Sequence, residues 1–196
     1  MERTERLILA SGSPRRRELL RGLGLEFEVM VSPDAEAPHP GLGPEELVRA
    51  LAEEKALRVQ ALAADPDAVI VAADTVVEID GTVLGKPGNP ERAKEMLSSL
   101  SGRTHRVWTG VCVRRGERML CRAECTQVCF RELSSREIGA YVDTGEPMDK
   151  AGAYGIQGRA ALFVREIRGD YFNVMGLPLC VLGLMLREFG VEPLVR

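Results

Sequence analysis

The sequence predicts an α/β protein with a mixed sheet flanked by helices. Short apolar runs, typical of strands, alternate with segments whose leucines recur at helical spacing. Two turn signals, Asp80-Gly81 and Arg115-Gly116-Glu117, add antiparallel hairpins to this pattern. A chain of 196 residues can bury one sizeable core, and no internal repeat divides it. We therefore expect a single domain over residues 1–196.

The first strand, residues 7–10, leads directly into a turn and a helix. Ser13 suits the N-cap position and Pro14 the first helical position, while Gly24 provides the stop. Three consecutive arginines, Arg15 to Arg17, then lie in the first turn, where the helix dipole is already positive. This local electrostatic conflict needs an explanation.

A bound phosphate would resolve the conflict. Helix N–H groups, the hydroxyls of Ser11 and Ser13 and the guanidinium groups together form a receptor for an anion. The stretch therefore indicates a polyphosphate substrate. The alternative is an ordinary basic helix face with its arginines in water.

The next segment combines a strand, an acidic loop and a long helix. Residues 26–31 alternate apolar and charged side chains like a half-buried strand, and a Pro-rich loop over 32–43 carries Asp34 and Glu36. A helix then begins at Pro44. Taken alone, Lys55 in its middle fits a solvated helix face.

A hairpin follows, and an acid stands next to its first strand. Residues 68–73 predict a strand buried on both faces that ends at Asp74 and Thr75. Counted from the Asp80-Gly81 turn, Asp74 and Lys86 lie near matching depths, so their charges can face one site. An ordinary cross-strand ion pair is the alternative.

The second half of the chain predicts more helices and strands around a Gly-rich segment. His105 and Trp108 fit packing roles better than catalytic ones. Residues 145–158 are too apolar for a linker, and they carry more polar groups than a loop without a function needs. We therefore expect this segment to form one wall of a pocket. The expected elements are a helix from Pro90 to Leu100, strands over 106–113 and 119–130, a helix opened by the capping box Ser134–Glu137, a strand over 160–167 and a helix over 179–189.

Charge, hydropathy and cysteine content narrow the class of protein. The net charge of −3 argues against a general nucleic-acid binder. Neither a signal peptide nor a membrane-spanning run is evident, so we expect a soluble cytoplasmic protein. The five cysteines contain no Cys-x-x-Cys pair, and we expect reduced thiols. A metal site at Cys121, Cys125 and Cys129 is the less favoured alternative.

Several motifs, in order, resemble the Maf family of nucleoside triphosphate pyrophosphatases over nearly the whole chain. The family fold is α/β, an elongated mixed sheet flanked by helices, with two lobes around a nucleotide cleft, similar to inosine triphosphatases. The matching motifs are Ser11-Gly12-Ser13-Pro14-Arg15-Arg16, Ala73-Asp74-Thr75-Val76, Gly85-Lys86-Pro87, Leu100-Ser101-Gly102, residues 145–158 and Gly169-Asp170-Tyr171-Phe172-Asn173-Val174.

The resemblance implies a reaction and its residues. A nucleoside triphosphate would be split into monophosphate and pyrophosphate with a divalent cation, Mg²⁺ or Mn²⁺. Asp74 would be the proton acceptor and a metal ligand, with Glu36 assisting the metal; Ala35 stands where the family often has another acid. Ser11 would contact substrate, and Arg16, Lys55 and Lys86 would surround the triphosphate.

The resemblance also implies a substrate class and partners. Arg15, Thr75 and Gln157 match the branch that acts on dTTP and UTP, and a glutamine amide can pair with the edge of a pyrimidine. The family is usually homodimeric. Because it is named for inhibition of septum formation, the alternative function is a regulator of septation that acts by binding a partner, with nucleotide as its ligand. Neither nucleic acid nor membrane is an expected partner.

Overall fold

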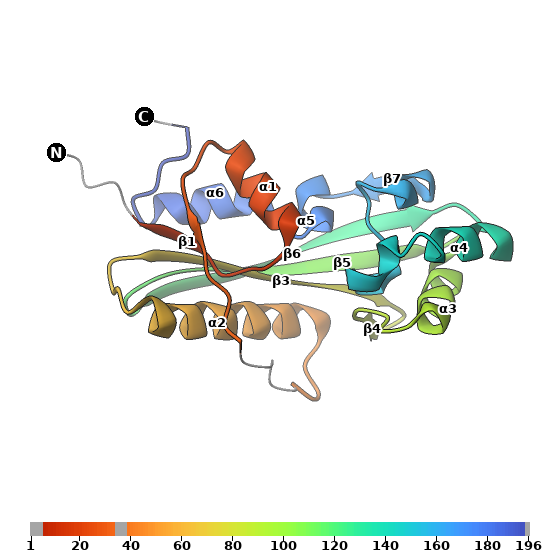
Figure 1. Cartoon of the computed structure of the whole chain (residues 1–196), viewed down its shortest axis with the longest axis horizontal. Helices are drawn as coiled ribbons and strands as arrows, with labels where there is room; N and C mark the ends of the chain where they lie inside the picture. The colour runs from red at the N-terminus through yellow and green to blue at the C-terminus, as the bar shows by residue number, and fades with distance from the viewer. Residues whose placement is uncertain (1–5, 34–38, 195–196) are drawn as a thin grey trace. The chain divides into compact units, whose positions relative to one another are not determined.

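A mixed sheet with helices on its faces forms the framework of the protein (Figure 1). The computed structural model describes residues 6–33 and 39–194. The strand order is β2-β1-β3-β5-β6-β7, and β4 pairs with β3 outside this path. The strands are β1 (Leu7–Leu9), β2 (Glu28–Val29), β3 (Val69–Ile79), β4 (Thr82–Leu84), β5 (Thr104–Arg115), β6 (Arg118–Phe130) and β7 (Val164–Arg168). The α-helices are α1 (Pro14–Gly22), α2 (Pro44–Ala63), α3 (Pro90–Leu100), α4 (Ser135–Val142), α5 (Tyr171–Met175) and α6 (Leu179–Arg187).

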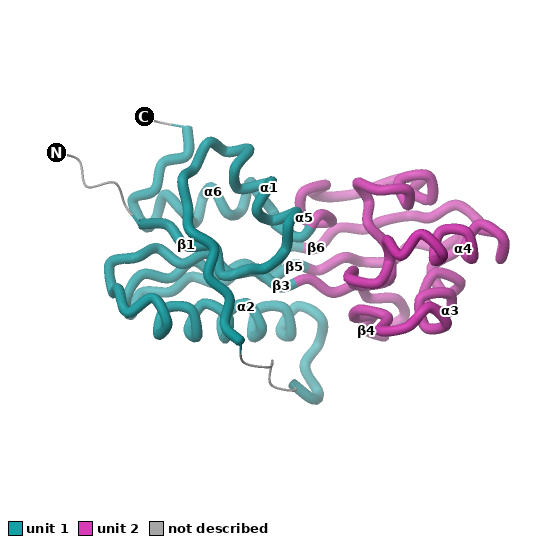
Figure 2. The backbone as a smooth tube through the Cα atoms, in the orientation of Figure 1, with its two compact units in different colours: residues 1–74, 109–124, 176–196 teal, residues 75–108, 125–175 magenta. Residues whose placement is uncertain are grey.

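The chain folds into two compact units, which Figure 2 distinguishes by colour. Unit 1 contains residues 1–74, 109–124 and 176–196, and unit 2 contains residues 75–108 and 125–175. Strands β3, β5 and β6 each contribute residues to both units. The mixed α/β sheet predicted from the sequence is confirmed.

Unit 1 contains the parallel part of the sheet, which helices cover on both faces (Figure 1). Strand β1 pairs in parallel with β2 and β3, with Ile8 opposite Ile70 in the second pair. Helix α2 covers one face, and α1 and α6 cover the other (Figure 1). Burial on both faces explains why β1 and the first half of β3 are continuously apolar.

Unit 2 is organised around a hairpin, two helices and an aromatic cluster. Asp80 and Gly81 have φ values of 51° and 77°, which allow the tight turn between β3 and β4. His105, Phe130, Tyr154, Phe163 and Tyr141 pack with their rings edge to face. His105 is 2% exposed, which confirms its predicted packing role.

Local sequence signals located most element boundaries correctly. The Asn89 side chain accepts a hydrogen bond from the Arg92 nitrogen at 2.8 Å and caps α3. At α4, Ser134 and Glu137 form the reciprocal capping box that the sequence predicts. Gly24, with φ of 72°, follows the end of α1 as expected.

Three expectations about elements were wrong. Strand β2 has only two residues, both exposed, because just Glu28 and Val29 pair with β1 at the sheet edge. Strand β3 does not end at Asp74 but continues to Ile79. The expected strand over 160–167 begins as a 3₁₀ turn, Arg159–Leu162, and β7 is mostly exposed. Ser13 occupies the N-cap position of α1 as expected, although its side chain makes no capping hydrogen bond.

The expectation of reduced thiols was also wrong for two cysteines. A disulfide joins Cys112 on β5 to Cys121 on β6, with Cα atoms 4.1 Å apart. The two positions are equally distant from the tight turn at Gly116 and Glu117, so the hairpin brings them opposite each other. Cys125, Cys129 and Cys180 are not part of a disulfide.

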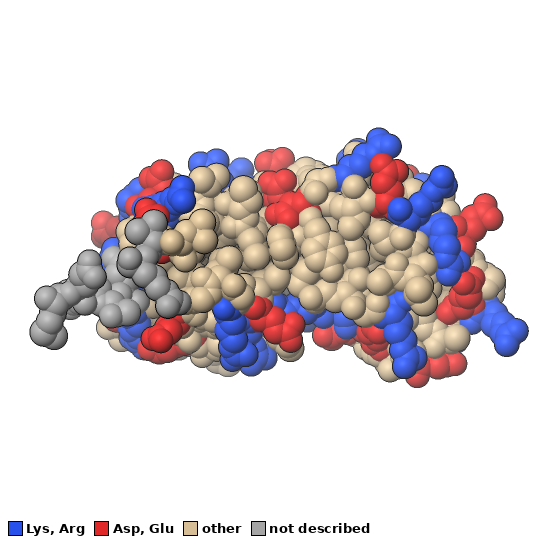
Figure 3. Space-filling view, turned by 90° about the horizontal axis from the view of Figure 1, so that it is seen from above, with Lys and Arg blue, Asp and Glu red and all other residues tan. Residues whose placement is uncertain are grey.

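The surface carries charges of both signs. Figure 3 shows acidic and basic side chains interspersed around the displayed face, without a broad field of one sign.

Within residues 6–33 and 39–194, no helix has the length and apolar character needed to cross a membrane.

Candidate active site

Asp74 and Lys55 form an ion pair inside unit 1. Lys55 Nζ donates a hydrogen bond to Asp74 Oδ1, and the two side chains are 23% and 14% exposed. Asp74 is the first residue of β3 after five that are fully buried. The sequence-based interpretation of Lys55 as part of a solvated helix face is therefore wrong.

The alternation of β3 and the periodicity of α2 explain this pair. Ala68, Ile70 and Ala72 belong to one buried cluster with Ala52, Ala56 and Val59 of α2. Because side chains two residues apart share a strand face, Asp74 continues the row that contacts α2. Lys55 lies on the same side of the helix as that apolar stripe, so its ammonium reaches the carboxylate.

The arginine-rich turn is held by hydrogen bonds within unit 1. Arg16 Nε donates to the Gly176 carbonyl at 2.6 Å, and Arg16 Nη1 donates to Ser11 Oγ at 3.2 Å. The backbone nitrogen of Ser13 donates to the same Ser11 hydroxyl at 3.3 Å. The hydroxyl of Ser11, and not that of Ser13, therefore holds the turn. No local sequence pattern predicts the hydrogen bond between Arg16 and the Gly176 carbonyl. Arg15 lies beside Arg16 in the first turn of α1 and is half-buried.

The register of the parallel strands brings the turn and Asp74 to one end of the sheet. Leu9 pairs with Val71, and the Ala10 nitrogen donates to the Val71 carbonyl at 2.7 Å. Extended by a few residues, this register sets Gly12 opposite Asp74. In parallel α/β sheets, the carboxyl ends of strands are where ligands bind. Unit 1 thus combines a carboxylate, an ammonium and a guanidinium-lined turn at one sheet end.

Unit 2 carries the remaining predicted residues. Lys86 follows the end of β4 and Gln157 lies in the Gly-rich segment; both are exposed. The Gly152 nitrogen donates to the Gly85 carbonyl at 3.1 Å, which joins the two segments that carry them. Thr75 is half-buried on β3.

The hairpin register alone does not pair Asp74 with Lys86. The β3–β4 ladder runs from Ile79–Thr82 to Val77–Leu84 and ends there. Lys86 lies beyond the end of β4. Strand pairing therefore does not extend far enough to place Lys86 opposite Asp74, as counting from the turn had predicted. Glu36 and Asp34 lie outside the described residues.

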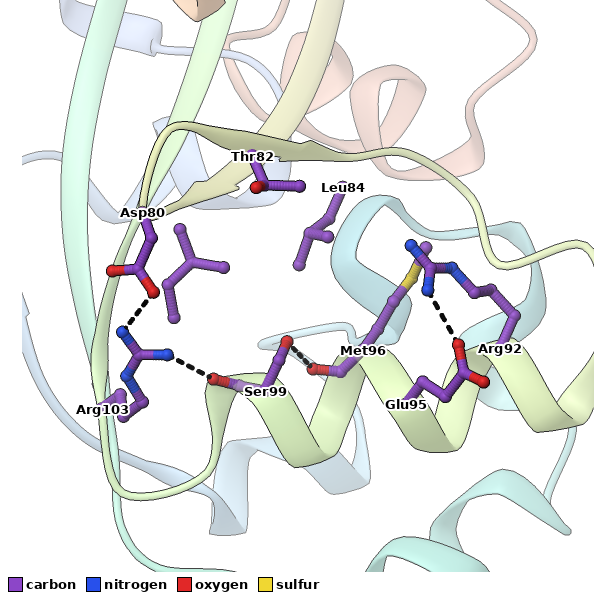
Figure 4. A pocket seen from close by; sticks show the side chains of 9 residues that line it. Asp80, Thr82, Leu84, Arg92, Glu95, Met96, Ser99 and Arg103 are labelled. Atoms are coloured by element: carbon purple, nitrogen blue, oxygen red, sulfur yellow. Dashed lines mark hydrogen bonds and ion pairs between the residues drawn. The ribbon is translucent and has the colours of Figure 1, made fainter.

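A hollow of about 240 Å³ in unit 2 is not this site (Figure 4). It lies between the β3–β4 hairpin and α3, and none of the predicted site residues line it. Its charged side chains neutralise each other, because Arg103 pairs with Asp80 at 2.6 Å and Arg92 pairs with Glu95 at 2.8 Å.

The carboxylates of the site do not form a ready-made metal cage. Among residues 6–33 and 39–194, no group of three or more His, Cys, Asp or Glu side chains is arranged to hold a metal ion. Mg²⁺ is usually bound by one or two carboxylates together with water and substrate phosphates. Asp74 fits that mode, and it does not require a protein cage.

The fold belongs to a known class of α/β structures. The Staphylococcus aureus Ham1 protein matches it with a TM-score of 0.50 over 94% of this chain and 99% of that chain. Sequence identity is only 12%, so this likeness concerns the fold alone.

The sequence comparisons are more specific. The model of the Maf family, described as Maf-like protein, matches residues 6–189, and the chain belongs to this family. A relative from Bacillus pumilus, named dTTP/UTP pyrophosphatase, is 49% identical over 95% of this chain and 98% of its own length. Relatives of the same name from Symbiobacterium thermophilum and Moorella thermoacetica are 52% and 53% identical over 95% of this chain, covering 95% and 96% of their own lengths.

Proposed function

We propose that this protein is a nucleoside triphosphate pyrophosphatase that hydrolyses dTTP and UTP to the monophosphate and pyrophosphate. The observation that carries the proposal is the Lys55–Asp74 pair at the sheet end where the turn from Ser11 to Arg16 begins. A carboxylate next to a cation-lined turn suits attack of water on a phosphoanhydride. Relatives about half-identical over nearly their full lengths carry this activity in their names.

In this proposal Asp74 is the general base. Its Oδ1 is held by Lys55, and Oδ2 accepts a proton from the water that attacks the α-phosphorus. The bond between the α-phosphorus and the bridging oxygen breaks, and pyrophosphate leaves with the electron pair. Arg16, Lys55 and Lys86 neutralise the charge that develops on the phosphate oxygens. Ser11 keeps Arg16 in place.

A divalent cation, Mg²⁺ or Mn²⁺, belongs to the proposal. Asp74 and Glu36 would hold it together with phosphate oxygens. Bound there, it would lower the charge on the phosphates and make the phosphorus a better electrophile. Mg²⁺ is commonly held by one or two carboxylates together with substrate phosphates, which is the mode proposed here.

Base selection is assigned to Arg15, Thr75 and Gln157. The exposed Gln157 amide offers both a donor and an acceptor, which suits the carbonyl and N–H edge shared by uracil and thymine. Cytosine presents a donor where uracil presents an acceptor, so discrimination against CTP is expected.

We also propose that the protein is a cytoplasmic homodimer. Light scattering on the purified protein tests whether it is a dimer.

Pyrophosphate release from a panel of nucleotides tests the proposal. The panel contains dTTP, UTP, CTP, dATP and GTP, each with Mg²⁺, with Mn²⁺ and with EDTA. Metal-dependent turnover of dTTP and UTP well above the others is expected. Turnover of another base instead would contradict the roles of Arg15, Thr75 and Gln157. Absence of turnover with every nucleotide would overturn the activity and favour a nucleotide-binding regulator.

A further inference from the structure

The Gly-rich segment of unit 2 is wrapped around one carboxylate, that of Glu146. Glu146 opens the 3₁₀ turn Glu146–Asp149, and its side chain is directed at the turn over residues 155–159. Oε2 accepts a hydrogen bond from the Arg159 nitrogen at 3.1 Å, and Oε1 accepts one from the Tyr141 hydroxyl at 3.0 Å. One carboxylate thus joins α4 to the end of this turn.

Tyr141 completes the link on the other side of the same turn. Its hydroxyl accepts a hydrogen bond from the Gly155 nitrogen at 3.2 Å while it donates to Glu146. Tyr141 is 4% exposed and packs edge to face against Phe163. Both ends of the turn, Gly155 and Arg159, are therefore anchored to the Glu146–Tyr141 pair, and that pair rests on a buried ring.

The glycines of the turn show how closely it approaches the carboxylate. A Cβ atom at Gly158 would overlap the Glu146 carboxylate, lying 2.5 Å from Cδ and 2.7 Å from Oε2. At Gly155, a Cβ atom would lie 2.5 Å from the Lys150 Cε atom. The φ of Gly158 is −92°, outside the left-handed region, so its backbone conformation does not demand glycine. A side chain at position 158 would instead have to displace the Glu146 carboxylate.

Gln157 lies within this anchored turn. It is exposed, whereas the preceding residues 152–156 are buried. An exposed glutamine has several rotatable bonds, and it can discriminate between bases only if its backbone is held in one place. Nothing in the local sequence would fix that backbone, because two of the neighbouring residues are glycines.

We propose that Glu146 is a positioning residue that sets base selectivity by holding the turn that carries Gln157. This inference rests on the proposed function, because it assumes that Gln157 contacts the base. It adds a residue, Glu146, that acts through the backbone and not by touching the nucleotide. Removing the charge of Glu146 weakens its bond with the Arg159 nitrogen and so loosens that end of the turn, while Tyr141 still holds the Gly155 end.

The test is the selectivity of Glu146→Gln, measured as the ratio of kcat/KM for dTTP to that for CTP. A glutamine keeps the size of the side chain but carries no charge, so the hydrogen bond that it accepts from the Arg159 nitrogen is no longer charge-assisted and is weaker. We expect the ratio to fall about tenfold, the equivalent of one hydrogen bond. Gly158→Ala, which displaces the carboxylate from the opposite side, is expected to reproduce the loss. Glu95→Gln is the matched control, since this exposed carboxylate pairs with Arg92 of its own helix, α3.

A double-mutant cycle separates positioning from a general structural effect. In a Gln157→Ala background, Glu146→Gln should cause no further loss of selectivity, because the residue that it positions is gone. A full tenfold loss in that background would overturn the proposal. So would an unchanged ratio in both folded variants, Glu146→Gln and Gly158→Ala, when the wild-type enzyme turns over dTTP. Absence of turnover by the wild-type enzyme would instead overturn the proposed function on which this inference rests.

Discussion

Gly110 on β5 passes so close to Val48 on α2 that no side chain fits between them. A Cβ atom at position 110 would overlap the Val48 carbonyl group and lie 2.8 Å from the Arg49 nitrogen. These are backbone atoms of a helix, which cannot move aside as a flexible side chain can. This close approach lets α2, the helix that carries Lys55, pack directly against β5.

We therefore predict that Gly110→Ala lowers the free energy of unfolding by about 3 kcal/mol or more. Thermal unfolding followed by circular dichroism measures the change. The matched control is Gly139→Ala in α4, where a Cβ atom meets nothing within 4 Å. That substitution should raise stability by up to about 1 kcal/mol, because alanine is the better helix former. Equal effects at the two positions would contradict the close approach.

Asp74→Asn should fold and lose activity. Asparagine keeps the shape of the side chain but cannot accept the proton from water, and the loss of a general base costs about 10²–10⁴-fold in kcat. Steady-state pyrophosphate release measures it. Lys55→Met should reduce kcat as well, while Lys94→Met, at an exposed site on α3, serves as the control. An Asp74→Asn enzyme with more than half of the wild-type kcat would exclude Asp74 as the base.

Arg16→Lys should weaken catalysis although the charge is kept. Arg16 uses two different nitrogens, one for the Gly176 carbonyl and one for Ser11 Oγ, and a lysine ammonium cannot reproduce this fork. We expect kcat/KM for dTTP to fall about tenfold, since at least one of the positioning bonds is lost. Arg21→Lys, in the last turn of the same helix, is the comparison. Similar kinetics for both variants would argue against a special role for Arg16.

Stability should decrease on acidification below about pH 6.5 because of His105. Burial lowers the pKa of His105 from 6.5 to about 4, while the unfolded chain keeps the ordinary value. Between these two pH values the unfolded state binds more protons, so protons favour unfolding. The full contribution, present above pH 6.5 and lost as pH falls through 4, is roughly 3 kcal/mol.

Urea unfolding at several pH values measures this dependence. His105→Gln can still hydrogen bond with the Tyr154 hydroxyl, which lies 2.8 Å from His105 Nε2, but it does not titrate. The variant should therefore lack most of the slope between pH 6.5 and 4. An unchanged slope in His105→Gln would assign the acid sensitivity to other groups.

Reduction of the Cys112–Cys121 disulfide should lower stability modestly. The bridge closes a short loop across the β5–β6 hairpin, with a sequence separation of nine, and short loops contribute least, about 2.5 kcal/mol in the chain-entropy model. Thiol titration of the unfolded protein should find three free thiols before reduction and five after it. Five free thiols in the untreated protein would show that the bridge does not form. Cys180→Ser, at an exposed free thiol, should not change the unfolding midpoint.

The elements predicted correctly are those encoded by local chemistry. Asn89 with Pro90, Ser134 with Glu137, and Asp80 with Gly81 each specify a cap or a turn through atoms only a few residues apart. The wrong predictions depended on long-range pairing. The alternating pattern of residues 26–31 fits a half-buried strand, yet pairing with β1 ends after two residues, and the pattern alone cannot report that.

The candidate site divides in the same way. The arginine cluster and Asp74 stood out from the sequence, because their charges conflict with the local helix dipole and with a buried strand. The local pattern did not point to Lys55, because 19 residues separate it from Asp74 and its place on the helix fits a surface residue. Only the family resemblance placed it beside the triphosphate. The Gly176 carbonyl and Glu146 were missed for the same reason: each acts on residues distant along the chain or through backbone atoms.

The sequence by itself determined the family, the chemical groups available for phosphate binding and the positions of the principal turns and caps, since these depend on short-range geometry and residue type. Only the tertiary structure decided which charges meet. The register of β1 against β3 and the packing of α2 through Ala52, Ala56 and Val59 bring Lys55 to Asp74. This register and this packing are favoured because they bury apolar surface across the sheet. That stabilisation depends on residues from many segments, so no single stretch of sequence predicts it.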